Sequence, residues 1–306
     1  MPAVPPCSAP YYRGVALVLA AGVFLSIGGI GVRLIEAADE WQILFYRSLT
    51  LIVTLLAVLA VRNRGALPGA LPGAFRTAGA PAVAGGLCLS FGFVGFIFSL
   101  THTSVANTLF LLSVSPFLAA LLGRFVLGEG VRRTTWLAMS AALAGVAVMV
   151  GEGFATGSPF GNLSALLAAL GFAGFTVALR RGKTRDMLPS VCLAAVFTAL
   201  VAGVMVSAGA GGFAISARDL GLCAVMGAVQ IGAGLTIYTA GSRHVPAAEL
   251  ALLSLSEVVL GPIWVWLGVG EVPSLATVIG GAVVLGAIVG HAASGLRRWR
   301  PPIGAV

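Results

Sequence analysis

Apolar stretches long enough to cross a lipid bilayer follow one another along almost the whole chain. A membrane-spanning helix needs about 20 predominantly apolar residues, and only 9% of the 306 residues are charged. A backbone in lipid must satisfy its own hydrogen bonds, and the short alternating pattern of barrel strands is absent, so we predict an all-α integral membrane protein. The ten expected spans cover residues 14–35, 41–61, 79–100, 105–127, 135–151, 161–179, 188–208, 220–240, 245–267 and 274–293. The longest polar interruption, residues 62–78, contains several glycines and prolines and predicts a loop.

The basic residues predict the orientation of these spans. If the N-terminus is cytoplasmic, the loops on that side carry 15 Lys and Arg residues and the opposite loops carry two, Arg33 and Arg218. By the positive-inside rule, both termini are then cytoplasmic, with residues 1–13 as an N-terminal segment and residues 294–306 as a basic tail. Because the basic residues lie mostly in the loops on one side, the positive-inside rule explains the net charge of +8, and we expect no nucleic-acid partner.

Two stretches of the chain resemble each other. Residues 106–129 parallel residues 248–271, and both stretches end in Gly-Glu before another apolar span, while residues 14–33 match residues 161–180 at a constant offset. The chain therefore divides into two five-span repeats, residues 14–151 and 161–293. An odd number of spans places the repeats in opposite orientations, the design of many secondary transporters, whose substrate site lies near the midplane between repeats with alternating access.

Three elements of the sequence match the motifs of one known family. They are Tyr46-Arg47-Ser48, the element from Ser115-Pro116 to Gly128-Glu129, and its counterpart from Glu257-Val258 to Gly270-Glu271, where Val258 departs from the expected proline. In these elements, and over nearly its whole length, the chain resembles bacterial members of the drug/metabolite transporter superfamily, of the EamA type, which include exporters of aromatic and other neutral amino acids. The resemblance implies ten helices, cytoplasmic termini, a place in the bacterial inner membrane and export of small metabolites.

Two ionisable residues lie deep in the expected spans. A charge at the centre of a membrane costs about 2.5 to 3.5 kcal/mol on insertion scales, so each needs an explanation. Arg47 could bind a substrate carboxylate through its fork of N–H donors, or it could bond helix-end carbonyls or Glu257 in a structural role. Glu257 could hold an ammonium group or the proton that drives transport, or it could be a buried structural carboxylate.

The other candidates for substrate binding are aromatic or uncharged polar residues. Aromatic faces suit an apolar side chain, and uncharged hydrogen bonds release a solute more easily than charges do, although helix packing explains the same patterns. We also expect Trp264 and Trp266 to anchor at the membrane interface, Glu249 to be solvated, and Gly286 and Gly290 to pack against the fifth span. The candidates besides Arg47 and Glu257 are Tyr46, Phe91, Phe98, Asn107, Gln230, Tyr238 and Ser254.

The sequence lacks the motifs of an enzyme or a metal centre. His102, His244 and His291 lie in separate segments, and the four cysteines have no paired spacing, so we expect no catalytic residue, no metal and no cofactor. We predict a secondary transporter that exports neutral or aromatic amino acids, driven by the solute gradient or by protons. The alternatives are a lipophilic-cation exporter, which should carry a carboxylate in its first span, and an intramembrane enzyme for lipid-linked substrates.

Overall fold

The described part of the chain folds into helices only. The computed structural model describes residues 9–62, 67–150, 158–209, 212–269 and 274–296. Within these ranges nine helices are long and apolar enough to cross a membrane, and the helix at the fifth expected span, Arg133–Met149, is apolar but shorter. Cys7, the Gly270-Glu271 pair and the basic tail from residue 297 lie outside the described ranges.

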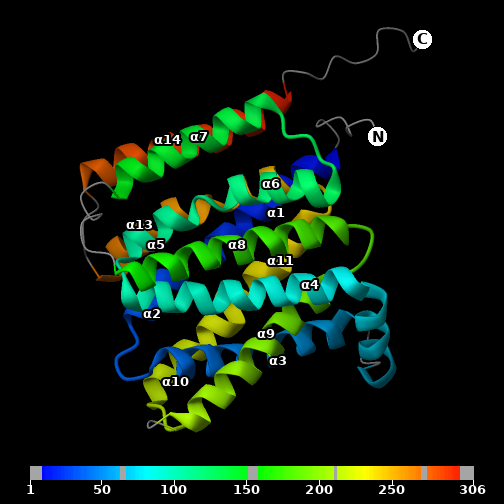
Figure 1. Cartoon of the computed structure of the whole chain (residues 1–306), viewed down its shortest axis with the longest axis vertical. Coiled ribbons are helices and arrows are strands. Elements are labelled where there is room, and N and C mark those ends of the chain that lie inside the picture. Colours follow the sequence, from blue (N-terminus) through cyan, green and yellow to red (C-terminus); the bar gives the residue numbers. More distant parts are fainter. Residues whose placement is uncertain (1–8, 63–66, 151–157, 210–211, 270–273, 297–306) are drawn as a thin grey trace.

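Each repeat contains broken as well as continuous helices (Figure 1). The first repeat consists of α1 (Ala9–Leu25), α2 (Gly28–Arg33), α3 (Glu40–Arg62), α4 (Leu67–His102), α5 (Val105–Leu112), α6 (Ser115–Leu127) and α7 (Arg133–Val150). The second consists of α8 (Pro159–Arg181), α9 (Leu188–Ala208), α10 (Ala217–Val225), the π-helix η2 (Met226–Ala233), α11 (Gly234–Ser242), α12 (Ala247–Ser254), α13 (Ser256–Val269) and α14 (Leu275–Leu296).

Local sequence signals account for several helix ends. Ser104, Ser158 and Ser216 cap the starts of α5, α8 and α10, and each hydroxyl accepts a hydrogen bond from the backbone N–H three residues later. Gly128 ends α6 with φ 67°, a left-handed conformation that favours glycine. These caps satisfy backbone groups that lipid cannot satisfy.

The expected loop over residues 62–78 is wrong from Leu67 onward. Helix α4 begins at Leu67 and runs to His102, interrupted at Gly79, where φ is 64° and ψ is −158°. Pro68 lies in the first turn, where its missing N–H breaks no intrahelical bond, and alanine, the strongest helix former, recurs through the segment. The break at Gly79 therefore separates an additional helical segment from the membrane span.

The two repeats interleave. Helix α4 packs against α8 and α9, α3 against α9, α1 against α11, and α7 lies beside α14 (Figure 1). Glycines permit the closest crossings: a Cβ atom on Gly171 of α8 would lie 2.6 Å from the backbone nitrogen of Gly92 on α4. The bundle therefore joins the repeats through backbone contacts as well as side chains.

Helices α7 and α14 meet at a different glycine pair from the expected one. A Cβ atom on Gly145 would lie 2.8 Å from the carbonyl oxygen of Gly280, and one on Gly280 would clash with the carbonyl of Gly145. Gly286 and Gly290 are exposed, and no atom lies within 4 Å of where their Cβ atoms would be. The prediction that these two glycines pack against the fifth span is therefore wrong.

Charged loops gather at one end of the bundle, where α1 begins and α14 ends (Figure 1). There Arg180 Nε lies 2.7 Å from Glu129 Oε1, and Arg243 Nη2 lies 3.4 Å from Asp186 Oδ1. We call this the basic end. At the opposite end the carboxylate of Asp219 accepts hydrogen bonds from the backbone N–H groups of residues 36–38, which ties α10 to the loop before α3.

Glu249 is buried near the basic end rather than solvated. Its side chain accepts a hydrogen bond of 2.8 Å from the hydroxyl of Tyr11, and His291 Nε2 lies 3.5 Å from its carboxylate. Helices α1 and α14 cover this face of α12, so Glu249 is only 6% exposed. The expectation of a solvated glutamate failed because hydropathy does not show which helices cover a residue.

Candidate solute site

A central cavity of about 360 Å³ lies between the repeats. Its walls come from the break between α1 and α2 and from α3, α4, α5, α8, η2 and α13, with contributions from α7, α11 and α14. Ligand pockets measure roughly 300 to 1,000 Å³, so the volume suits a small metabolite.

The cavity extends from the middle of the bundle toward the end opposite the basic end. Arg33, Val105 and Met149 line it at the ends of α2, α5 and α7, and Ser274 and Thr277 line it at the start of α14. All these helix ends lie opposite the end where α1 begins (Figure 1). The lining of the cavity therefore reaches from the middle of the bundle to the helix ends opposite the basic end.

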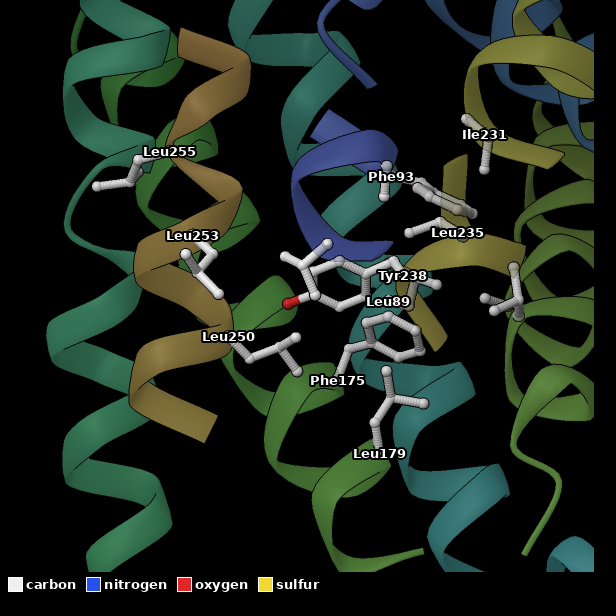
Figure 2. Close-up of a cluster of buried hydrophobic side chains, with 14 of the residues drawn as sticks. Leu89, Phe93, Phe175, Leu179, Ile231, Leu235, Tyr238, Leu250, Leu253 and Leu255 are labelled. Carbon is white, nitrogen blue, oxygen red and sulfur yellow. The ribbon is translucent and has the colours of Figure 1, made fainter. Parts of the chain in front are cut away.

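A group of buried, mostly apolar side chains packs together on the side of the cavity that lies toward the basic end (Figure 2). At its centre the rings of Tyr238 and Phe175 stack with centroids 6.3 Å apart, and the hydroxyls of Tyr238 and Thr176 are 3.0 Å apart. We call this group the apolar plug. Its labelled members are Leu89, Phe93, Phe175, Leu179, Ile231, Leu235, Tyr238, Leu250, Leu253 and Leu255.

Arg47 lines the cavity from α3 with donors to spare. The side chain is 1% exposed, and neither Nε nor Nη2 has a hydrogen-bond partner in the described structure. Its Cζ atom lies 5.1 Å from the ring centroid of Phe93. The structural alternative, bonding to helix-end carbonyls or to Glu257, is not seen among the described residues. A buried guanidinium with unused donors is costly alone and suits an anionic group of a ligand.

Glu257 lines the same cavity from the first turn of α13, two residues after the break at Leu255. Within the ranges that the structure describes, it forms neither a hydrogen bond nor an ion pair below 4.0 Å. One cation and one carboxylate in the interior therefore face a shared space without pairing with each other.

Gln230 completes the polar part of the cavity from the π-helix η2. Its Nε2 donates a hydrogen bond of 3.3 Å to the carbonyl of Leu25, and its buried Oε1 has no partner in the described structure. Gly227 allows this segment to touch the backbone of α3 at Arg47. π-helical turns occur frequently at functional sites, and this one places an unused acceptor beside Arg47 and Glu257.

Three other predicted site residues hold the end opposite the basic end together. The hydroxyl of Tyr46 donates to the carbonyl of Phe213, and Asn107 Nδ2 donates to Asn162 Oδ1. The ring of Phe98 packs edge-on against Trp41 with centroids 4.9 Å apart. None of Tyr46, Asn107 and Phe98 lines the cavity.

The last three predicted site residues also lie outside the cavity lining. Phe91 is 58% exposed on the outer surface of α4, and Tyr238 is fully buried in the apolar plug. The hydroxyl of Ser254 donates to the carbonyl of Ala251 within its own helix. The structure thus brings Arg47, Gln230 and Glu257 together and leaves the other six elsewhere.

The aromatic lining comes from neighbours of the predicted residues. Phe93 and Phe96 of α4 face the cavity together with Phe172 of α8. Gly92 and Gly95 of α4 both lie against the backbone of α8, and a Cβ atom on Gly95 would lie 2.5 Å from the carbonyl oxygen of Ser164. These glycines were the signal in the sequence that could have identified the side of α4 that packs on α8. Trp264, expected at the interface, donates from Nε1 to Ser26 Oγ at 2.7 Å and ties α13 to the break after α1.

Comparisons with known proteins agree with this architecture. The pseudopaline exporter CntI of Pseudomonas aeruginosa, from strains UCBPP-PA14 and PAO1, is 27% identical over 256 residues, which cover 81% of this chain and 84% of the exporter. A crystal structure of a protein superimposes with a TM-score of 0.73 and covers 94% of this chain and 98% of its own, at 19% identity, which shows a shared fold. The EamA-like transporter family matches residues 12–151 and 159–292, the two repeats. The chain therefore belongs to the EamA-like transporter family.

Proposed function

We propose that this transporter exports small zwitterionic metabolites, and neutral or aromatic amino acids first among them, from the cytoplasm across the bacterial inner membrane. The observation that carries the proposal is the pair of unpaired opposite charges, Arg47 and Glu257, in one cavity. A zwitterion neutralises both groups at once, whereas a lipophilic cation would leave the guanidinium of Arg47 buried and unpaired.

Each part of an amino acid has a partner of matching chemistry. The guanidinium of Arg47 offers N–H donors to the carboxylate, and the carboxylate of Glu257 accepts from the ammonium group. The rings of Phe93, Phe96 and Phe172 receive an apolar or aromatic side chain. The free Oε1 of Gln230 provides a further uncharged acceptor.

The direction of transport rests on the orientation of the bundle and on the relatives. We assign the basic end to the cytoplasm by the positive-inside rule, so the cavity extends toward the outer side and the apolar plug lies on its cytoplasmic side. The named activity of the Pseudomonas relatives, export, supports the same direction. Loading from the cytoplasm then requires the plug to open while the outer end closes, which is alternating access between the repeats.

Substitution of Arg47 tests the proposed site. We expect Arg47→Gln to lower amino-acid counterflow in proteoliposomes by about tenfold or more, because a charge-assisted hydrogen bond to the solute is lost. Arg47→Lys keeps the charge without the fork and should retain part of the activity. Lys183→Gln, an exposed cation at the basic end, is the matched control and should transport normally.

A competition series decides the substrate class. The assay measures how far each unlabelled compound inhibits counterflow of the labelled solute in proteoliposomes. The compounds are phenylalanine, tryptophan, leucine, methionine, threonine and a lipophilic cation. Competition by the amino acids and failure of the cation support the proposal. If only the lipophilic cation competes, or if Arg47→Gln transports amino acids at the normal rate, the zwitterion proposal is wrong.

A further inference from the structure

A second cavity, of about 240 Å³, lies at the basic end between α1, α9 and α11. It shares no lining residue with the central cavity. Helix α11 contributes Leu235 to the central cavity, Tyr238 to the apolar plug and Thr239 to the second cavity. The proposed solute site in the central cavity therefore does not explain the second cavity.

The lining of the second cavity is mostly polar and carries excess positive charge. Arg13 from α1 and Arg243 from the end of α11 contribute two cations, and His244 lies beside them. Asp186 contributes one carboxylate, which lies 3.4 Å from Arg243 Nη2. Two arginines against one aspartate leave one positive charge even when the histidine is neutral.

A buried hydroxyl points to a ligand with acceptor oxygens. Thr239 is 3% exposed, and its Oγ1 has no hydrogen-bond partner in the described structure, although the residue lines the cavity. Its neighbour Thr236 differs, because its hydroxyl already donates to the carbonyl of Gly232. A buried polar atom without a partner is costly, and an oxygen atom in the cavity would satisfy Thr239 and attract both arginines.

We propose that this cavity binds the phosphate group of an anionic phospholipid from the leaflet at the basic end. The cavity lies beside the first half of α1, the first residue of α9 and the last turn of α11, at the end of the bundle where basic residues would meet anionic headgroups. Leu17 and Leu188 provide apolar surface beside the polar groups, as the first acyl carbons require. The bound phosphate bridges α1 of the first repeat and α9 and α11 of the second.

Lipid titration of the purified full-length protein tests this site. We expect phosphatidylglycerol to raise the midpoint of thermal unfolding saturably in detergent, and native mass spectrometry to detect one tightly bound copy. Phosphatidylcholine and inorganic phosphate at the same concentration should give little or no shift. If inorganic phosphate gave the full shift, the ligand of this cavity would be free phosphate and the lipid proposal would be wrong. An equal shift with phosphatidylcholine would also overturn the proposal.

Variants distinguish the cavity from general attraction of lipids to the basic end. Arg13→Gln and Thr239→Val should each weaken phosphatidylglycerol binding by about tenfold. Arg181→Gln removes an exposed charge at the same end outside the cavity and should bind like the original protein. Normal binding by both cavity variants, or equal weakening by Arg181→Gln, would contradict the site. Amino-acid counterflow at saturating lipid should survive in all three variants, which separates this proposal from the transport proposal.

Discussion

At the scale of single residues, the central cavity is defined by charges that do not neutralise each other. Arg47 and Glu257 come from different repeats, and the structure shows no ion pair between them below 4.0 Å. If Arg47 and Glu257 formed a direct ion pair, a charged solute would have to break that pair in order to bind. Two separated charges inside the membrane are costly, and a zwitterion would neutralise both, which supports the proposed substrate class.

Proton coupling is part of the proposal, and Glu257 is its candidate carrier. We expect Glu257→Gln, which keeps the size of the side chain and cannot ionise, to abolish the pH dependence of net efflux from proteoliposomes. Solute exchange should continue at a lower rate, because the carboxylate proposed to accept from the ammonium group is lost. Glu36→Gln in the exposed loop before α3 is the control and should leave both unchanged. An unchanged rate and pH dependence in Glu257→Gln would assign Glu257 a structural role and favour downhill transport.

The sequence indicated the charged residues of the cavity better than its aromatic ones. A lone Arg or Glu in an apolar span must face other protein or a cavity, so Arg47 and Glu257 could be identified from their positions within apolar stretches of the sequence. Phe91 and Phe98 lie on the same helix as Phe93 and Phe96, and the face that turns inward depends on how α4 packs against α8 at Gly92 and Gly95. A periodic sequence pattern shows which residues share one face of a helix, but it does not show which helix or cavity that face contacts.

At the scale of elements, the two repeats share a helix break at corresponding positions. The alignment that pairs Ala106 with Ala248 also pairs Ser113, where α5 ends, with Leu255, where α12 ends. Pro116 lacks an N–H, which accounts for the break between α5 and α6. Its counterpart in the second repeat is Val258, so the break between α12 and α13 forms without a proline. Hydropathy predicted the ends of most spans but neither break, because a broken helix remains uniformly apolar.

The contact between α7 and α14 can be tested with glycine substitutions. We expect Gly280→Ala to destabilise the protein, because the new Cβ atom clashes with the carbonyl of Gly145 on a helix backbone that cannot move cheaply. Gly286→Ala on the same helix meets no atom within 4 Å and should be neutral or stabilising by up to about 1 kcal/mol through helix propensity. Thermal unfolding in detergent measures both. Equal loss in the two variants would place the α7–α14 contact elsewhere.

At the scale of the whole molecule, charge asymmetry predicts which end faces the cytoplasm. After replacement of the native cysteines, we expect an impermeant thiol reagent added to intact cells to label Ser216→Cys and to leave Lys183→Cys unlabelled. Both positions are exposed, and they lie at opposite ends of the bundle. Labelling of Lys183→Cys from outside would reverse the proposed orientation and the direction of transport.

The repeat architecture was the part of the whole molecule that the sequence predicted most fully. Matched apolar stretches and the paired Gly-Glu motifs identified two halves, and the family comparison confirmed them. The count of ten spans is less complete: nine described helices reach spanning length, whereas Arg133–Met149 is shorter. The packing of the apolar plug could not be predicted, because it depends on side chains from both repeats meeting in three dimensions.

The π-helix η2 has a mechanical consequence for the eighth span. A wide turn is less favourable than an α-turn, so Met226–Ala233 keeps its pitch only while its contacts with α1 and α3 hold. If a solute draws Gln230 away from the carbonyl of Leu25, we expect that pitch to relax. Tyr238 lies in α11, directly after η2, so such a change would turn the helix that carries it and would carry solute binding to the apolar plug as a rotation.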